Sequence, residues 1–331
     1  MPAKIHRDQD ADLSLLADKT VAVLGYGSQG AAQAQNLRDS GCRVIVTQRP
    51  GSPNYQRAIA DGFLPVSLGE AVAQAGVIAI LLPDEAQPEL FAKEIRPHLS
   101  PGKTLVFAHG FGVRFGLLDV PEGVAVYLVS PFGPGSLVRA AFLRGEGVPC
   151  LVARRDAGDL ALALAYAKAI GATRAGAIES TFAEETETDL FAEQAVLCGG
   201  MGALMRTAFD TLVAAGYQPE VAYFTCIHEV KQIVDLVYRG GLAFMRRSIS
   251  NTAEYGDYTR GPRIVGESSQ SEMARILEEI RDGRFAREWL DESRQGAPRL
   301  DALRRDAEAH ASEDVGRRLR ALMPWLDAAG D

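Results

Sequence analysis

Cysteine is scarce in this chain of 331 residues, which contains four cysteines and no Cys-x-x-Cys pair. The spacing of these cysteines indicates neither a zinc site nor a disulfide framework. A reducing, cytoplasmic location is therefore expected. The four are Cys42, Cys150, Cys198 and Cys226.

The sequence also lacks a basic excess and long apolar runs. Its formal net charge of -8 argues against binding to nucleic acid or to an anionic membrane surface. No apolar run approaches the ~20 residues that span a bilayer. Residues 1–12 are polar and charged, unlike a signal peptide. We expect neither a nucleic-acid nor a membrane partner, but a small-molecule substrate.

The first half of the chain alternates short apolar runs with helical stretches, as in a parallel sheet covered on both faces. This predicts an α/β fold with a Rossmann-type, doubly wound parallel sheet. After about Thr181 the strand-like runs stop and helical patterns replace them. We therefore expect two domains, residues 1–181 and an all-helical domain over residues 182–331. The predicted strands are 21–24, 44–46, 77–82, 105–107, 125–129 and 148–152.

Two kinds of helix are predicted in the second half. Residues 190–213 and 219–238 are apolar on most faces, so they should be buried in a large core or against a second subunit. Residues 268–289 and 298–325 are charged and amphipathic, which is typical of surface helices.

A glycine-rich turn follows the first predicted strand and opens a helix over residues 29–38. In that context its spacing indicates a dinucleotide site, because glycines let the backbone approach a pyrophosphate at the helix N-terminus. A glycine-rich turn without a ligand is the alternative. The predicted cofactor-binding residues of the turn are Gly25, Tyr26, Gly27, Ser28, Gln29 and Gly30.

The segment after the second predicted strand favours NADP(H) over NAD. An NAD site usually has an acidic residue there to bind the ribose 2′-hydroxyl, and residues 47–54 contain none. Arg49 offers a cationic fork for a 2′-phosphate, and Ser52 and Asn54 offer neutral donors. The alternative for Arg49 is a solvated loop arginine.

Two long motifs point to one family. Residues 184–200 read Glu-Glu-Thr-Glu-Thr-Asp-Leu-Phe-Ala-Glu-Gln-Ala-Val-Leu-Cys-Gly-Gly, and residues 248–257 read Ser-Ile-Ser-Asn-Thr-Ala-Glu-Tyr-Gly-Asp. Shorter matches are 83–85, 107–111 and 133–135. The chain resembles ketol-acid reductoisomerases of the short class with one helical domain, from Asp8 to Trp325.

The resemblance implies a two-step reaction that depends on NADPH and two magnesium ions. A 2-hydroxy-2-alkyl-3-keto acid undergoes an alkyl shift and is then reduced to a 2,3-dihydroxy acid. The resemblance also implies an intertwined homodimer, with metal ligands from both subunits. A second chain would then cover the apolar helices, and any larger assembly stays open.

Asp189 and Glu193 are the first candidate metal ligands. They are four residues apart on a predicted helix, so their carboxylates face the same way and suit Mg²⁺. A solvated acidic face is the usual alternative, but the flanking apolar residues favour burial, where unpaired carboxylates are costly. The family pattern implies that Asp189 bridges two ions and Glu193 binds one.

The sequence departs from the family at several site positions. Residues 225–229 read Thr-Cys-Ile-His-Glu where the resemblance implies Glu-Cys-Leu-His-Glu, so Glu229 keeps a ligand position and Thr225 replaces one. Phe132 stands where the resemblance implies the catalytic lysine. Ala31 and Gln33 replace two histidines. Three carboxylates against one Mg²⁺ leave a net charge near -1, and a second ion would have too few ligands. We expect at most one ion, weakly bound.

The remaining candidates surround the nicotinamide and the substrate. His109 follows a predicted strand at the ligand-binding edge and could polarise or protonate the substrate; a histidine bonded to the backbone is the alternative. Ser250 matches a serine that contacts the substrate carboxylate, and the alternative is a helix-end hydroxyl. Asp189, Glu193 and Glu229 could also supply a proton. Pro83, Asp84, His109 and Gly135 are predicted on the cofactor side, and Phe132, Thr225, Ile249, Ser250 and Ala253 in the substrate pocket.

Three functions stay open from the sequence. The first is an NADPH-dependent reductase of a ketone or imine that has lost the isomerase step, because the losses fall on the step that needs most charge stabilisation. The second is a ketol-acid reductoisomerase that tolerates the substitutions. The third is a cofactor-binding protein without catalysis.

Overall fold

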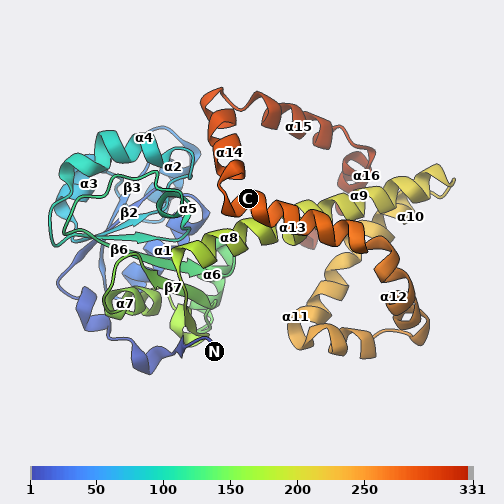
Figure 1. The fold of residues 1–331 in the computed structure, drawn as a ribbon, viewed down its shortest axis with the longest axis horizontal. Helices are drawn as coiled ribbons and strands as arrows, with labels where there is room; N and C mark the ends of the chain where they lie inside the picture. The colour runs from blue at the N-terminus through green and yellow to red at the C-terminus, as the bar shows by residue number, and fades with distance from the viewer. Residues whose placement is uncertain (1, 327–331) are drawn as a thin grey trace. The chain divides into compact units, whose positions relative to one another are not determined.

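The computed structural model describes residues 2–326, in two compact units that divide between Thr188 and Asp189. The first unit is an α/β domain built on one eight-stranded sheet, and the second is all-helical (Figure 1). The expected fold class is confirmed. The division falls inside a helix, beyond the boundary expected at residue 181, and the domain boundary stays a prediction.

The sheet has the strand order β1-β8-β7-β6-β5-β4-β2-β3. Strands β2 to β6 pair in parallel, as expected, but β7 is antiparallel to β6 and β1 is antiparallel to β8. The sheet is therefore mixed rather than wholly parallel. Strands β1 and β8 were not predicted, because two and three residues are too few to show a period. The strands are β1 Ile5–His6, β2 Thr20–Leu24, β3 Arg43–Thr47, β4 Val77–Ile80, β5 Thr104–Phe107, β6 Ala125–Pro131, β7 Cys150–Arg154 and β8 Ala177–Glu179.

Successive strand residues pack into different cores on the two faces of the sheet. In β2, Val21 and Val23 join one core with α1 and α7, whereas Ala22 and Leu24 join the other with α3. This two-sided burial explains why the strands are continuously apolar. The helices of this unit are α1 Ser28–Asp39, α2 Pro53–Ala60, α3 Leu68–Gln74, α4 Gln87–Leu90, α5 Phe111–Arg114, α6 Gly135–Leu143 and α7 Ala161–Ala169.

The second unit contains more breaks between helices than expected. The predicted helix 268–289 divides at Gly283, whose φ of 76° suits glycine, and the predicted helix 298–325 ends early because His310 caps a new helix. A helix over Asn251–Ile264 was not predicted. The helices are α8 Phe182–Ala192, which begins in the first unit, α9 Gly199–Ala214, α10 Pro219–Tyr223, α11 Val230–Arg247, α12 Asn251–Ile264, α13 Glu267–Arg281, α14 Arg284–Arg294, α15 Pro298–Glu308 and α16 Ala311–Arg320.

Two short π-helical turns interrupt the long apolar helices. One, Glu193–Leu197, joins α8 to α9, and the other, Phe224–His228, joins α10 to α11. A Cβ at Gly199 or Gly200 would lie 2.2 or 2.0 Å from the carbonyl oxygen five residues earlier, so the glycine pair permits the first turn. Such turns are frequent at functional sites. Both lie in the segments predicted to carry metal ligands.

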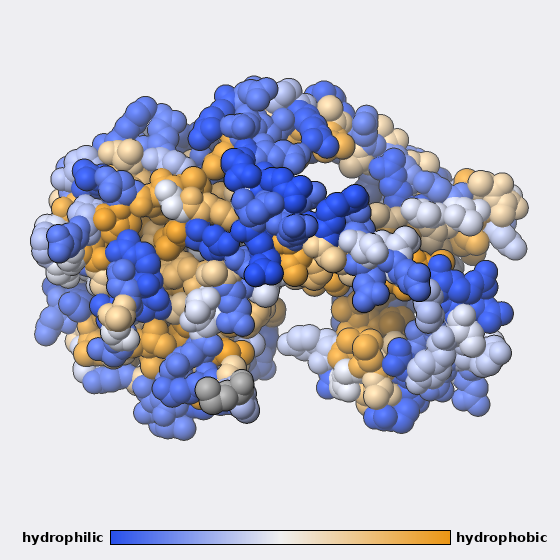
Figure 2. Space-filling view, viewed as in Figure 1, coloured by the Kyte–Doolittle hydropathy of each residue, from blue (hydrophilic) through white to orange (hydrophobic). Residues whose placement is uncertain are grey.

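The apolar helices are not buried within one chain. Residues 182–214 form one helix of 33 residues that is long and apolar enough to cross a membrane by length and composition alone, and 6% of its most apolar stretch is buried. This helix contains Arg206 and Asp210, so it is not an uninterrupted apolar run of ~20 residues, and the expected absence of a membrane partner stays a prediction. Figure 2 shows apolar side chains at the surface of both units. The exposed apolar residues of α9 and the turn before it are Val196, Leu197, Met201 and Leu204.

Candidate active site

The glycine-rich turn lies between β2 and α1 and has the shape of a pyrophosphate cradle. Gly25 has a φ of +96°, and a Cβ there would lie 2.7 Å from the carbonyl oxygen of Leu81. A Cβ at Gly30 would meet the Gly25 carbonyl at 2.0 Å, so this glycine brings helix and turn together. Gly27 precedes α1, and space beside it is open, with no atom within 4 Å of a Cβ. A phosphate can therefore approach the first turn of α1.

The other residues of the turn hold it in place. The Tyr26 ring is fully buried, and its hydroxyl donates to Asp61 at 2.8 Å, so this side chain belongs to the core, and the cofactor contact predicted for Tyr26 stays a prediction. Burial, with the hydrogen bond to Asp61, raises the pKa of Tyr26. Ser28 accepts from the amide of Gly135 at 3.1 Å, and Gln29 donates to the Gly133 carbonyl at 2.8 Å.

The segment that follows β3 presents one cation and no carboxylate. Arg49 is exposed, and among residues 2–326 no partner of its guanidinium is found. Ser52 caps α2 by accepting from the Tyr55 amide at 3.2 Å, and its hydroxyl donates to the Arg49 carbonyl. Asn54 is half-buried in the first turn of α2. Ser52 therefore has a structural role as the cap of α2, and its phosphate contact stays a prediction.

His109 and Asp84 come together at the carboxyl edge of the sheet. Nδ1 of His109 lies 2.9 Å from Oδ2 of Asp84, and Gln87 donates to the other Asp84 oxygen at 3.1 Å. An ionised carboxylate only accepts, so Nδ1 carries the proton of this bond. His109 is thus bonded to a side chain, not to the backbone alone. Pro83, next to Asp84, is exposed at the same edge.

Glu185 is a site residue that sequence reasoning missed. It is 2% exposed, and its carboxylate accepts from the Gly110 amide at 2.8 Å, the Ser130 hydroxyl at 2.9 Å and the Thr186 hydroxyl at 3.1 Å. These bonds join α8 to the ends of β5 and β6. The signal was present in the 184–200 motif, where Glu185 is four residues before Asp189 and therefore on the same helical face.

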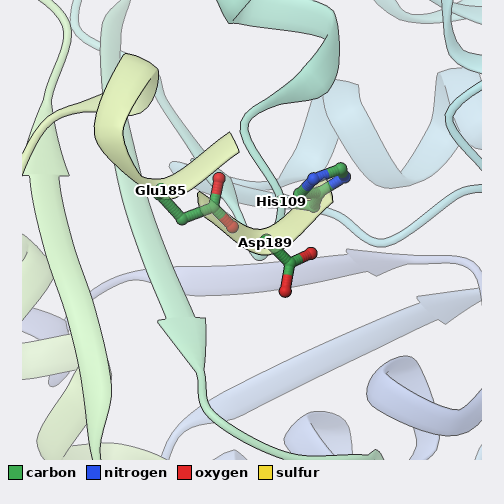
Figure 3. A group of neighbouring side chains, drawn as sticks. All are labelled: His109, Glu185 and Asp189. Atoms are coloured by element: carbon green, nitrogen blue, oxygen red, sulfur yellow. The ribbon is translucent and has the colours of Figure 1, made fainter. Parts of the chain in front are cut away.

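Figure 3 shows Glu185 and Asp189 on one helix, with His109 beside them. One ligand atom from each of the three lies within 4.8 Å of the others, a spacing that could hold a metal ion. Carboxylate oxygens suit Mg²⁺, although the Glu185 oxygens already accept several hydrogen bonds. Of the predicted metal ligands, only Asp189 belongs to this cluster.

The other predicted ligands are placed differently. Glu193 begins the first π-turn and is exposed; Thr225 lies in the second π-turn and Glu229 follows it, both exposed. Within residues 2–326 neither Glu193 nor Glu229 joins a group of three metal-binding side chains. The predicted set of Asp189, Glu193 and Glu229 is therefore not assembled in a single chain.

Phe132 directly follows β6, and its ring is 56% exposed. Because β5 and β6 are parallel neighbours, Phe132 lies at the same sheet edge as His109. Gly135 begins α6, and a Cβ there would lie 2.0 Å from the Ser28 carbonyl oxygen, so it packs directly on the cofactor turn.

The predicted pocket residues of the second unit surround the start of α12. Ser250 caps this helix by accepting from the Ala253 amide at 3.2 Å, as in the alternative of a helix-end hydroxyl. Ser250 and Ala253 are exposed and Ile249 is half-exposed. The capping bond occupies one lone pair of the Ser250 oxygen, so a substrate contact stays a prediction.

Comparison with known proteins identifies the family. Residues 15–176 match the model described as acetohydroxy acid isomeroreductase, NADPH-binding domain, and residues 182–325 match ketol-acid reductoisomerase, C-terminal domain. The chain belongs to the ketol-acid reductoisomerase family. A solved NADH-preferring ketol-acid reductoisomerase from an uncultured archean is 46% identical, with a TM-score of 0.93 over 97% of this chain and 99% of that one. This protein is therefore a nicotinamide-dependent oxidoreductase.

Two more distant structures share the fold alone. A semialdehyde dehydrogenase NAD-binding protein from Cupriavidus necator, solved with calcium and NAD, is 20% identical with a TM-score of 0.60, covering 80% of this chain and 99% of that one. A pyrroline-5-carboxylate reductase from Coxiella burnetii is 13% identical with a TM-score of 0.55, covering 80% and 98%.

Proposed function

We propose that this protein is an NADPH-dependent reductase of a small ketone or imine, keto-acid-like or more apolar, that has lost its family's alkyl migration. The observation that carries the proposal is Phe132. The exposed Phe132 side chain stands at the same sheet edge as His109, at a position where the resemblance implies a lysine. A phenyl ring can neither donate a hydrogen bond nor balance negative charge, but it does favour an apolar substituent.

The loss of charge falls on the harder of the two steps. Alkyl migration requires a tertiary alcohol to be deprotonated and the alkoxide to be held, which needs strong positive charge. Phe132 removes one cation, and Thr225 replaces a carboxylate that would help to hold a metal ion. Reduction of a carbonyl or imine needs less, because it requires only a positioned hydride donor and a proton.

The residues on the first unit suit reduction. The bound nicotinamide supplies the hydride that the carbonyl or imine carbon receives. The oxygen or nitrogen of that group takes a proton, and His109 is placed to hold it. Asp84 accepts from Nδ1 and fixes the ring, so the proton passed to the substrate is a second one, held on Nε2 of the imidazolium, and its loss returns His109 to the neutral form. Glu185 fixes the His109–Gly110 segment by accepting from the Gly110 amide.

NADPH is the proposed cofactor because the β3–α2 segment has a cation and no acid. Arg49 is exposed and can bind a 2′-phosphate, whereas residues 47–54 offer no carboxylate for a ribose 2′-hydroxyl. The 46% identical relative is described as NADH-preferring, so the preference of this protein for NADPH over NADH has to be measured. Equal or lower KM for NADH than for NADPH would contradict the proposal.

We expect at most one Mg²⁺ for each chain. Asp189 and Glu185 would hold it, and the ion would polarise a carbonyl oxygen as a Lewis acid. Glu193, one helical turn beyond Asp189, is the nearest further carboxylate along the helix. The replacement of a carboxylate by Thr225 weakens the second site of the family pattern.

The test compares a substrate before and after its rearrangement. The purified protein is given 2-acetolactate, or its rearranged isomer 3-hydroxy-3-methyl-2-oxobutanoate, with NADPH or NADH, with and without Mg²⁺. A panel of simple 2-keto acids and cyclic imines runs beside them. The proposal expects oxidation of NADPH with the rearranged isomer or a panel compound, and little with 2-acetolactate. Ordinary turnover of 2-acetolactate with Mg²⁺ would refute the loss of isomerisation.

A working ketol-acid reductoisomerase is the second candidate, favoured by the 46% identity over nearly the whole chain. The double substitution Phe132→Lys with Thr225→Glu separates the two. Under the proposed function it increases metal binding and restores some conversion of 2-acetolactate. No gain in metal binding would count against the family-pattern site, in which Thr225 takes the place of a carboxylate beside Asp189, Glu193 and Glu229. If the protein binds the cofactor but oxidises neither NADPH nor NADH with any compound of the panel, the result would support the third function, a cofactor-binding protein without catalysis.

We also propose that two chains form an intertwined homodimer. The exposed apolar residues of α9 and the preceding turn are the support, because isolated apolar faces of this kind are costly in water. A second copy of the chain would bury them. The resemblance implies metal ligands from both subunits, so Glu229 of one chain would serve the metal site of the other. The cytoplasmic location stays a prediction.

A further inference from the structure

A chain of side-chain hydrogen bonds links the buried helix α7 to the turn that follows Phe132. The Tyr166 hydroxyl of α7 donates to Oε1 of Gln33 at 2.8 Å. Nε2 of Gln33 donates to Oε1 of Gln29 at 3.0 Å. Nε2 of Gln29 then donates to the carbonyl oxygen of Gly133 at 2.8 Å. Both glutamines lie on α1, four residues apart, so their amides are neighbours on one helical face.

The acceptor at one end sets the direction of every bond in this chain. The Gly133 carbonyl can only accept, so Gln29 must turn Nε2 towards it and Oε1 towards Gln33. Gln33 must then turn Nε2 towards Gln29 and Oε1 towards Tyr166, whose hydroxyl donates. Gln33 and Tyr166 are 1% and 0% exposed, so water does not replace a lost partner. Burial raises the pKa of Tyr166, which keeps the donated proton on its oxygen.

The turn held in this way is packed against the cofactor helix. The Gly135 amide donates to the Ser28 hydroxyl at 3.1 Å, and there is no room for a side chain at Gly135. Asn36 extends the contact, because its side chain accepts from Arg139 of α6 at 2.8 Å. The segment carrying Phe132 is thus held along α1, the helix whose first turn would face the pyrophosphate of a bound dinucleotide.

We propose that Gln33 is a positioning residue: it fixes the direction of the Gln29 amide, and thereby holds the Gly133 turn and Phe132 against the start of the cofactor helix. Gln33 stands where the resemblance implies a histidine, so this device is a feature of the present chain. The expected effect on substrate binding rests on the proposed function, in which Phe132 lines the pocket. The expected effect on the order of the Gly133 turn is independent of the proposed function.

Substitution Gln33→Glu tests the direction of the bonds while keeping the side-chain shape. Burial raises the pKa of the introduced carboxyl group, so exchange is measured at pH 8 and again at about pH 10. Once ionised, the carboxylate only accepts, so it competes with Gly133 for the Gln29 amide group. Hydrogen exchange of backbone amides 132–137 should become about tenfold faster, because the turn loses its tether. In kinetics with the rearranged keto acid, KM should rise by roughly 3–10-fold and kcat should change less.

Two further variants make the result specific. Tyr166→Phe removes one bond of the same buried network without turning Gln29, so exchange in 132–137 should stay near that of the unmodified protein. Adding Gln29→Lys to Gln33→Glu supplies an ammonium that donates to both partners, and should restore slow exchange. If Gln33→Glu fails to fold, Gln33→Met, which buries no charge, replaces it and should give a smaller increase in exchange.

Three results would overturn the proposal: unchanged exchange in Gln33→Glu, an equal increase in Tyr166→Phe, or no recovery in the double variant. Exchange is measured without substrate, so these results are independent of the proposed function. If exchange behaves as expected but the unmodified protein reduces no compound of the panel, Gln33 still positions the turn, and only the assigned reaction fails.

Discussion

Removal of the Glu185 carboxylate should destabilise the first unit strongly, whereas replacement by the amide should not. Glu185→Ala leaves the Gly110 amide buried without an acceptor, which costs about 1–3 kcal/mol, and the lost side-chain atoms leave a cavity that adds about 1–2 kcal/mol. The hydroxyls of Ser130 and Thr186 can rotate, so they add less. The total is about 2–5 kcal/mol. Glu185→Gln keeps one oxygen for the Gly110 amide, and Ser130 can rotate to accept from the new NH2 group, so we expect a cost below about 1 kcal/mol.

Scanning calorimetry measures this difference. For a unit of this size about 1 kcal/mol corresponds to a shift of about 2–4 °C, so Glu185→Ala should lower the Tm of the first unit by about 5–15 °C and Glu185→Gln by less than about 4 °C. Glu184→Ala, on the exposed neighbour, is the matched control and should change little. A Glu185→Ala protein that unfolds within about 1 °C of the parent would refute the hydrogen-bond argument. Equal losses for Ala and Gln would show that the charge, not the geometry of the acceptor, supports the fold.

Three other predictions concern the cofactor, the metal and the assembly. Ser52→Asp keeps a good cap on α2 but places a negative charge beside the 2′-phosphate, so KM for NADPH should rise about tenfold with little change in KM for NADH. Ser52→Asn is the neutral control. An equal rise in KM for both variants would show that loop geometry, not charge, is the cause. Titration of the protein with Mn²⁺, followed by electron paramagnetic resonance, should show no more than one bound ion for each chain. The ion should be lost in Asp189→Asn and kept in the control Glu184→Gln, which changes an exposed residue. Two tightly bound ions would contradict the charge count. Leu204→Asp should convert the proposed dimer to smaller species in light scattering. Leu143→Asp should not, although this leucine of the first unit is more exposed, 66% against 52%. An unchanged mass for Leu204→Asp would remove this face from the proposed interface.

Most of the α/β unit could be predicted from local sequence. The buried strands are continuous apolar runs in the sequence. The Gly25–Gly30 turn has the glycine spacing typical of a strand–turn–helix unit, and the strand, turn and helix follow each other as expected. The helical unit was predicted less well. Its helix ends depend on Gly283, on the His310 cap and on two π-turns. The spacing of apolar residues does not reveal a single residue that ends a helix or adds one residue to a helical turn.

The candidate site divides in the same way. The sequence alone determined the residue types: the glycine cradle, the acid-free segment around Arg49, and Phe132 and Thr225 in place of charged groups. Only the tertiary structure decided which of these residues meet. It joined His109 to Asp84 and to the buried Glu185, which are far apart in the chain, and it left Glu193 and Glu229 outside that cluster. It also placed the Tyr26 ring in the core. The physical reason is that a side chain's chemistry is local, whereas its partners and its burial depend on how strands and helices pack.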